Sequence, residues 1–384
     1  MKHKNFTYPF ILLFLVTAMQ LQGQKMRNHG DFEVHTNGQV GFFGPIINDG
    51  FFFSNSGLVG LYGESSYHIS GNVVPKLYDL EIANASSILL NVPVTISNNV
   101  NFILGDLETT KTDSINYLEF SQLSFSTGSS DFSKMNGFVK ANVQEHFMFP
   151  TGDNIFLRPI SVESTLLNVK HMACYLFEDS TKNYPFYSNE EIAQINTNEF
   201  WILKGAHQVS ITIDWNERSS IERITDDIND IEIVGYHIST SQWKSLGGRG
   251  NTGDLNSGFL SSEPFIPNDY AAITFGIFNQ NENEQPEIPL NSYHYMLSPN
   301  GDGINDKFII EELADYENNV LHIYDRNGLL VFEAQNYTDE FDGNTGKTIS
   351  ALDRDAGLAQ GIYYYIAAVN GGEFSIQGYL YIDR

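Results

Sequence analysis

The chain has 384 residues and a formal net charge of −26, because 47 acidic residues outnumber 21 Lys and Arg residues. This length allows two or three domains. The acidic balance argues against nucleic-acid partners, whose affinity comes mainly from neutralised phosphates, and against unaided binding to anionic lipid. Cys174 is the single cysteine, which excludes an internal disulfide.

The N-terminal segment has the pattern of a secretory signal peptide. Lys2 and Lys4 form a short cationic region, a mostly apolar run extends from Phe10 to Met19, and the small residue Gly23 suits a cleavage site. We therefore predict that residues 1–23 direct the protein into the periplasm and are removed. The apolar run is shorter than the roughly 20 residues that a membrane span requires. No later stretch is long and apolar enough either, so no integral membrane span is expected.

Residues 24–136 contain an internal repeat. The segment Val34–Gly44 aligns with Phe53–Gly63 at an offset of 19 residues. A looser third copy is expected at Ile82–Leu90 and a fourth start at Ile96. Repeats of this length predict the rungs of a short parallel β-solenoid, with Gly and Asn at corners that need left-handed backbone geometry. Because the spacings are uneven, an antiparallel sandwich of repeated hairpins is the alternative.

Residues 137–278 have the short, regularly interrupted apolar runs of a β-sandwich of the immunoglobulin-like type. Ile211, Ile213 and Trp215 alternate along one run, which predicts that all three face the core. Cys174 lies in another apolar run, which predicts a buried core thiol rather than a nucleophile. Six strands are expected, at Met172–Glu178, Glu199–Lys204, Val209–Trp215, Ile231–Gly235, Gln242–Leu246 and Tyr270–Phe278.

Residues 279–291 are polar and acidic and contain two prolines, which predicts a linker. The last segment, residues 292–384, has short strand patterns that predict another small immunoglobulin-like sandwich. Two of its expected strands are Lys307–Ile310 and Ile349–Leu352. Five motifs follow one another in this segment, namely Ser298–Asp306, Val320–Phe332, Phe341–Gly343, Gly361–Tyr365 and Gly378–Tyr379, and the chain ends with Ile382–Arg384.

With these ordered motifs, residues 292–384 resemble the gliding-motility-associated C-terminal domain of Bacteroidetes, which is the type B sorting domain of the type IX secretion system. The resemblance implies recognition by the type IX secretion machinery, export across the outer membrane, and display at the cell surface or release. Asn327 and Phe341 depart from the pattern, since a Trp is common at both positions. These departures concern local packing more than the assignment.

The loop Ser298–Asp306 also resembles part of a calcium loop. Asn300, Asp302 and Asp306 would supply oxygen ligands at the third, fifth and ninth positions of an EF-hand-type loop, with Gly303 at the sixth. The first and twelfth positions lack their usual acidic residues, so only a weak calcium site is expected. The alternative is a turn in which the Asn and Asp side chains accept backbone N–H groups. No other cofactor is expected.

Two other candidate sites, a phosphate-binding loop and a zinc site, are not supported by the sequence. Gly343–Thr348 mimics a phosphate loop, but Phe341 replaces the first required Gly and no helix pattern follows. No two histidines lie within five residues of each other, whereas zinc motifs usually place a ligand pair at such a spacing. We therefore expect a non-enzymatic, secreted cell-surface protein with an adhesive passenger that contacts glycan or matrix. A secreted polysaccharide-active enzyme or carbohydrate-binding protein is the alternative.

Overall fold

The computed structural model describes residues 25–384, apart from residues 55, 167–168, 189–190, 279–293, 314–315, 317, 345–356 and 370–373. The predicted signal peptide at 1–23 and the predicted linker at 279–291 lie outside the described residues. The described chain is built almost wholly of strands, so the all-β prediction is confirmed. Its helices are single 3₁₀ turns, and none of them is long and apolar enough to cross a membrane. These turns are η1 (Ser180–Lys182), η2 (Glu217–Ser219), η3 (Ile221–Arg223), η4 (Ile228–Asp230), η5 (Pro267–Asp269) and η6 (Glu311–Leu313).

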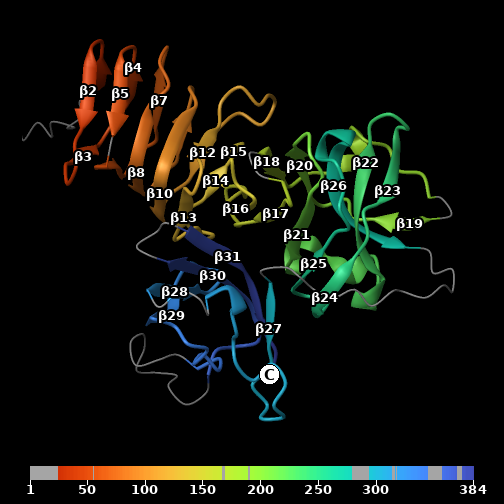
Figure 1. Ribbon diagram of the computed structural model, residues 1–384. Coiled ribbons are helices and arrows are strands. Elements are labelled where there is room, and N and C mark those ends of the chain that lie inside the picture. The colour runs from red at the N-terminus through yellow and green to blue at the C-terminus, as the bar shows by residue number, and fades with distance from the viewer. Residues whose placement is uncertain are drawn as a thin grey trace, which may run out of the picture.

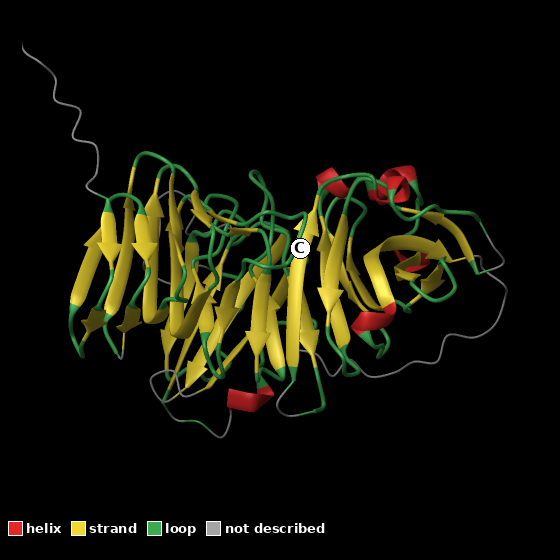
Figure 2. Ribbon diagram, turned by 90° about the horizontal axis from the view of Figure 1, so that it is seen from above, coloured by secondary structure: helices red, strands yellow, loops and turns green. Residues whose placement is uncertain are grey.

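The N-terminal part is a parallel β-solenoid, as predicted, with rungs that follow one another along an axis (Figures 1 and 2). One face holds β1 (Met26–Asn28), β4 (Ile46–Asn48), β7 (Tyr67–Gly71), β9 (Ile88–Leu90), β11 (Leu107–Glu108) and β14 (Met135–Asn136). A second face holds β2 (Asp31–Val34), β5 (Phe51–Ser54), β8 (Lys76–Asn84), β10 (Val94–Leu104), β12 (Leu118–Phe120) and β15 (Val139–Asn142), extended by β3 (Gln39–Phe42), β6 (Leu58–Gly63) and β13 (Phe125–Thr127).

The solenoid is held together by stacked apolar side chains and by backbone hydrogen bonds between rungs. Val59, Leu80 and Val100 lie in register on consecutive rungs, and each is at most 1% exposed. Buried polar side chains also stack, since Asn28 Nδ2 donates to Asn48 Oδ1 at 2.8 Å. Each rung thus pairs the backbone groups of the next, which a buried strand requires.

The structure confirms the second half of the first predicted repeat, but Val34 at its start pairs with Ser54 and not with Phe53. β3 lies against β6 with the predicted offset, so that Val40 pairs with Val59. The predicted third copy is wrong, because Phe53 pairs with Lys76 whereas Ile82 pairs with Leu61. The physical reason is that β8 is one continuous strand, whereas a corner separates β5 from β6. The Asn-containing corner on which the repeat was aligned is therefore missing in β8. The predicted fourth start is one residue late, since Thr95 is the partner of Lys76.

A β-sandwich continues directly from the solenoid. The predicted boundary at 136/137 falls between β14 and β15, two strands of the same rung, and β15 then pairs antiparallel with β18. Ile211, Ile213 and Trp215 are at most 1% exposed, as predicted. The first sheet runs through β18 (Lys170–Leu176), β20 (Phe200–Lys204), β26 (Tyr270–Phe278), β22 (Ile231–His237) and β23 (Gln242–Ser245), with β19 (Ile192–Ile195) beside β26. The second holds β16 (His146–Phe149), β17 (Ile160–Glu163), β21 (Ser210–Trp215), β25 (Gly258–Ser261) and β24 (Arg249–Gly253).

In the C-terminal region the described strands form one five-stranded sheet, rather than the two sheets of the expected sandwich. The order is β27 (Tyr295–Leu297), β31 (Phe374–Ile382), β30 (Gly361–Val369), β28 (Asn319–Tyr324) and β29 (Leu330–Gln335). The segment Lys307–Ile310 is not a strand, although Phe308 and Ile310 are buried. These two side chains pack into the core although the segment does not pair with another strand. The predicted strand Ile349–Leu352 lies outside the described residues. Phe341 is 1% exposed and packs on Phe332, with ring centroids 4.6 Å apart.

Candidate functional site

The three predicted calcium ligands lie in one exposed turn. The carboxylate of Asp306 accepts the backbone N–H groups of Gly301 and Gly303, both at 2.7 Å, and these bonds lower the pKa of Asp306. Asp302 Oδ1 accepts the N–H of Ile304, and Asn300 Oδ1 accepts the N–H of Asp302. The side chains are thus brought together, with their oxygens used by the turn itself. Calcium binding at this loop stays a prediction.

An aromatic ring lies flat on the outward face of the solenoid. Tyr62 in β6 points outward because Val59 and Leu61 take the inward positions. A Cβ atom at Gly60 would lie 2.1 Å from the Tyr62 ring, and one at Gly41 would lie 2.9 Å from it. Neither glycine has a positive φ. These two glycines are therefore not corners, and they leave room for the ring.

Hydrogen-bonding side chains continue from this ring across the next rungs. The Tyr62 hydroxyl donates to Glu81 Oε1 at 2.8 Å, and Asn101 Nδ2 donates to Glu81 Oε2 at 3.1 Å. Thr127 Oγ1 in turn donates to Asn101 Oδ1 at 3.2 Å. On the other side of Tyr62, the ring of Phe43 lies 5.5 Å away, and Phe43 is 66% exposed. The face therefore combines an aromatic platform with a polar row.

The electrostatics of this face favour fixed hydrogen bonds. Partial burial and the neighbouring Glu81 raise the pKa of Tyr62 to about 12, so its hydroxyl stays a donor at neutral pH. A second carboxylate, Asp79, accepts Asn98 Nδ2 at 2.6 Å. Partial burial raises the pKa of Asp79 against the opposing effect of that hydrogen bond. Both carboxylates are thus engaged as acceptors by neighbouring side chains.

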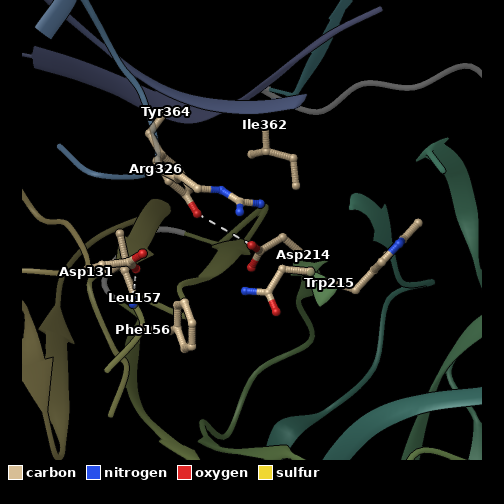
Figure 3. Close-up of a pocket in the computed structure, with 9 residues that line it drawn as sticks. Asp131, Phe156, Leu157, Asp214, Trp215, Arg326, Ile362 and Tyr364 are labelled. Atoms are coloured by element: carbon tan, nitrogen blue, oxygen red, sulfur yellow. Dashed lines mark hydrogen bonds between the residues drawn. The ribbon is translucent and has the colours of Figure 1, made fainter. Parts of the chain in front are cut away.

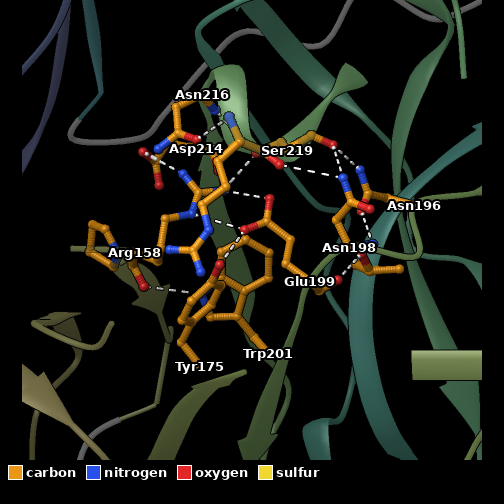
Figure 4. Close-up of polar contacts among 12 residues, drawn as sticks. Arg158, Tyr175, Asn196, Asn198, Glu199, Trp201, Asp214, Asn216 and Ser219 are labelled. Atoms are coloured by element: carbon orange, nitrogen blue, oxygen red, sulfur yellow. Dashed lines mark hydrogen bonds and ion pairs between the residues drawn. The ribbon is translucent and has the colours of Figure 1, made fainter. Parts of the chain in front are cut away.

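A buried ion network lies inside the sandwich (Figure 4). The side chain of Arg158 is 0% exposed. Its Nε and Nη2 donate to the two oxygens of Glu199 at 3.0 and 2.8 Å, and its Nη1 donates to Asp214 Oδ2 at 3.2 Å. Nη2 also donates to the Asp214 carbonyl and to Ser219 Oγ. The Tyr175 hydroxyl donates to Glu199 Oε2 at 2.7 Å.

Two carboxylates share one guanidinium in this network, which leaves a surplus negative charge. Burial raises the pKa of Asp214 to about 6, with Arg158 opposing the shift and Glu199 adding to it. Burial disfavours the charged form of Arg158, but attraction by Glu199 and Asp214 raises its pKa well above the usual value. Because the side chains of Arg158, Glu199 and Asp214 are at most 4% exposed, the network acts on structure. Sequence reasoning missed it, and its only signal is a lone Arg inside an apolar run.

The network holds the loop after β21, which separates two polar clefts. Asn216 caps η2 by accepting the N–H of Arg218, and Ser219 binds Arg158. One cleft, of about 430 Å³, includes Lys111 and Arg218, and the other, of about 290 Å³, includes Asn196. The aromatic residue of the larger cleft is Phe177, and the guanidinium of Arg218 covers its ring at 3.4 Å. The aromatic ring of the larger cleft is therefore already covered, and the smaller cleft is lined by the half-buried Phe186.

A small void lies where the C-terminal region meets the sandwich (Figure 3). Asp131, Leu157 and Asp214 line it from one side, and Arg326 and Tyr364 from the other. Its volume is about 10 Å³, which is the size of a single water and too small for an organic ligand. This region is therefore a contact between two parts of the chain.

Residues 290–382 match the family model of the CHU_C type IX secretion signal domain. The C-terminal region is a type IX secretion signal domain. This supports secretion by the type IX system, implies interaction with its machinery, and implies export to the cell surface or outside. Searches among curated proteins and among solved structures found no match. We call the described part of residues 294–384 the sorting domain and the described part of residues 25–278 the passenger.

Proposed function

We propose that this is a non-enzymatic surface protein whose solenoid contacts a glycan or a glycan-rich matrix. Residues 1–23 would direct it to the periplasm, and the sorting domain would then take it across the outer membrane. The observation that carries the proposal is the ring of Tyr62, which lies flat beside a row of hydrogen-bonding side chains on the outward face.

This combination suits a sugar chain. A pyranose ring has an apolar C–H face that can rest on an aromatic ring, and hydroxyl groups around its edge that need donors and acceptors. Tyr62 and Phe43 offer the aromatic surface. Glu81, Asn101 and Thr127 offer acceptors and donors on consecutive rungs. Because strands in a sheet lie about 4.8 Å apart, the row repeats at a regular spacing, as an extended polysaccharide does.

The charge of the face favours a neutral glycan. Asp79 and Glu81 both lie on this face, and the whole chain carries a net charge of −26. A polyanionic chain such as a polyuronate would be repelled at long range. A neutral polysaccharide avoids this repulsion and can still donate its hydroxyl groups to the two carboxylates.

The arrangement of the carboxylates favours binding over cleavage. Glycoside hydrolysis needs one carboxyl group as a proton donor and a second as nucleophile or base. Here Glu81 accepts hydrogen bonds from Tyr62 and Asn101, and Asp79 accepts one from Asn98. We therefore expect the protein to bind polysaccharide without releasing reducing ends.

Affinity electrophoresis of the purified protein in gels with neutral or uronate polysaccharides tests the proposal. A neutral polysaccharide should retard the protein, and Tyr62→Ala should weaken the apparent affinity three- to tenfold because the stacking surface is lost. Tyr187→Ala, at a 79% exposed tyrosine of the sandwich, is the matched control and should behave as wild type. The proposal is wrong if no neutral polysaccharide retards the protein, or if Tyr62→Ala binds as tightly as the control. A reducing-sugar assay on the same polysaccharides should stay at background.

A further inference from the structure

The sorting domain turns the side of β30 and β31 that lies opposite its own core toward the passenger. Along β30, Tyr363 and Tyr365 belong to the domain's own core, whereas Ile362 and Tyr364 belong to a cluster that includes passenger residues. In Figure 1 the ribbons of β30 and β31 lie directly against the passenger near β16 and β17, and β16 contacts β31. The strands β30 and β31 are therefore covered on both faces, on one by the core of their own domain and on the other by the passenger.

The contact is apolar and closely packed. From the sorting domain it contains Tyr379 and Tyr381, which are 0% and 2% exposed, besides Ile362 and Tyr364. From the passenger it contains Met148, Leu157 and Phe259, each at most 3% exposed. The rings of Phe259 and Tyr379 stack with centroids 5.7 Å apart and planes 27° apart.

Two tyrosine hydroxyls bind the passenger across this contact. The Tyr379 hydroxyl donates to the carbonyl of Pro159 at 3.1 Å, and the Tyr364 hydroxyl reaches Asp214 Oδ2 at 3.5 Å. Pro159 directly follows Arg158, and Asp214 is a partner of that arginine. The sorting domain thus contacts the outer side of the buried ion network, which fixes the position of both acceptors.

His294, the first described residue of the sorting domain, is also buried in the contact. It is 3% exposed, and its ring lies 5.9 Å from Phe259 and 4.8 Å from Tyr379. Its Nδ1 accepts the backbone N–H of Tyr379 at 3.1 Å. Burial lowers the pKa of His294 to about 3, so the ring is neutral at neutral pH and adds no unpaired charge.

The extent of this contact lies within the range of contacts between domains of one chain. A buried aromatic side chain removes about 150–250 Å² from water, so Tyr364, Tyr379 and Tyr381 bury at most about 450–750 Å² together, and part of this area lies against their own domain. Contacts between domains of one chain typically cover about 600–1,500 Å² in total. A separated sorting domain would expose all three rings as one patch, and patches of that size are rarely left open on a monomer.

We propose that the sorting domain is a lasting structural part of the exported protein, and that it stays bound to the passenger without a covalent link. Proteolysis between the two parts would then leave a two-chain complex instead of a free passenger and a discarded signal. This inference concerns association of the two parts only, so it stands or fails independently of glycan binding.

A protease recognition site placed within residues 279–291 of the full chain allows a direct test. The purified protein is cut to completion and passed over a size-exclusion column at about 1 µM, where complexes with a dissociation constant well below this value stay together. We expect both fragments to elute as one species of the uncut size. Elution of the wild-type fragments as separate species would overturn the proposal.

Three variants of the cleavable protein link the result to the observed contact. Tyr364→Ala with Tyr379→Ala should release the fragments. Tyr316→Ala, at a tyrosine of the same domain that is 38% exposed, is the control and should not release them. Tyr379→Phe removes only the hydroxyl, so it keeps the fold and should raise the dissociation constant three- to tenfold, as one buried hydrogen bond does. Continued co-elution of the double variant, or an unchanged constant for Tyr379→Phe, would show that this contact does not hold the parts together.

Discussion

Replacing Arg158 by methionine removes the centre of the buried ion network while keeping an unbranched side chain of similar length. The wild-type guanidinium makes hydrogen bonds to Glu199, Asp214 and Ser219 between 2.8 and 3.2 Å. In Arg158→Met the carboxylates of Glu199 and Asp214 stay buried and lose their counterion. Tyr175 is then the remaining donor to Glu199 among the bonds of this network.

The expected loss of stability is large for a single substitution. Removing one partner of a buried ion pair costs about 3–5 kcal/mol, because the other charge stays desolvated. For a protein of this size class each kcal/mol shifts the melting temperature by roughly 2–4 °C, so a decrease of about 6–20 °C follows. Differential scanning calorimetry and urea titration at pH 7 measure both quantities.

Two further variants separate the mechanism from a general effect of removing arginine. Arg27→Met breaks a surface pair with Asp49, in which the arginine side chain is 53% exposed, and should cost less than about 1 kcal/mol. Adding Glu199→Gln to Arg158→Met removes one unpaired charge and should recover part of the loss. If Arg158→Met unfolds within 1 kcal/mol of wild type, the argument that the network needs its guanidinium is refuted.

Three other outcomes follow from the structure. Gly60→Val places a Cβ against the ring of Tyr62, so it should weaken polysaccharide retardation as Tyr62→Ala does while circular dichroism stays unchanged. Burial raises the pKa of Asp214 from 3.8 to about 6, so folding favours its protonated form. The stability that Asp214 contributes to the folded state is therefore fully present below about pH 4 and is lost as the pH rises through about 6. The free energy of unfolding falls by up to about 3 kcal/mol over this range. Urea titrations of wild type and Asp214→Asn between pH 4 and 7 should therefore diverge in that sense. Burial raises the pKa of Cys174 to about 12, so maleimide at pH 8 should label it only after unfolding, and rapid labelling of the native protein would contradict its burial.

The sequence predicts strands well where one face of the strand alone is apolar. Ile211, Ile213 and Trp215 alternate, and all three face the core of the sandwich. The same pattern predicts that the intervening residues face water, but Thr212 and Asp214 are each 3% exposed. Their side of β21 is covered by elements distant in sequence, including the sorting domain. The alternation of apolar and polar residues along one strand cannot show that its polar face is covered by a distant part of the chain.

The solenoid repeat could be aligned only where each rung has the same corners. β3 and β6 share Gly and Val positions, and the offset read from them is the offset of the structure. β8 and β10 are continuous where earlier rungs bend, and both carry register shifts. The inward apolar positions of β8 and β10 match those of the earlier rungs, but the corners with Asn and Gly are missing. An alignment based on Asn and Gly therefore assigns the wrong register. The burial of Arg158 was missed for a different reason, since arginine is mostly exposed in proteins and is fully buried only when it is paired.

The charge of the buried network adds a second attraction between the passenger and the sorting domain. Arg158 balances one of its two carboxylates, so a negative charge remains close to the contact between the two parts. Arg326 of the sorting domain lines the void beside Asp214 and Asp131. Burial raises the pKa of both carboxyl groups, and attraction by Arg326 is one of the smaller effects that oppose this rise. The sorting domain therefore supplies a cation near two passenger acids, as well as an apolar cover. Because Arg326 is exposed, salt should screen this attraction, whereas the packing of Tyr379 should be insensitive to salt. Association of the two parts should consequently weaken only modestly between low and high ionic strength, since burial of the tyrosine rings supplies most of the contact.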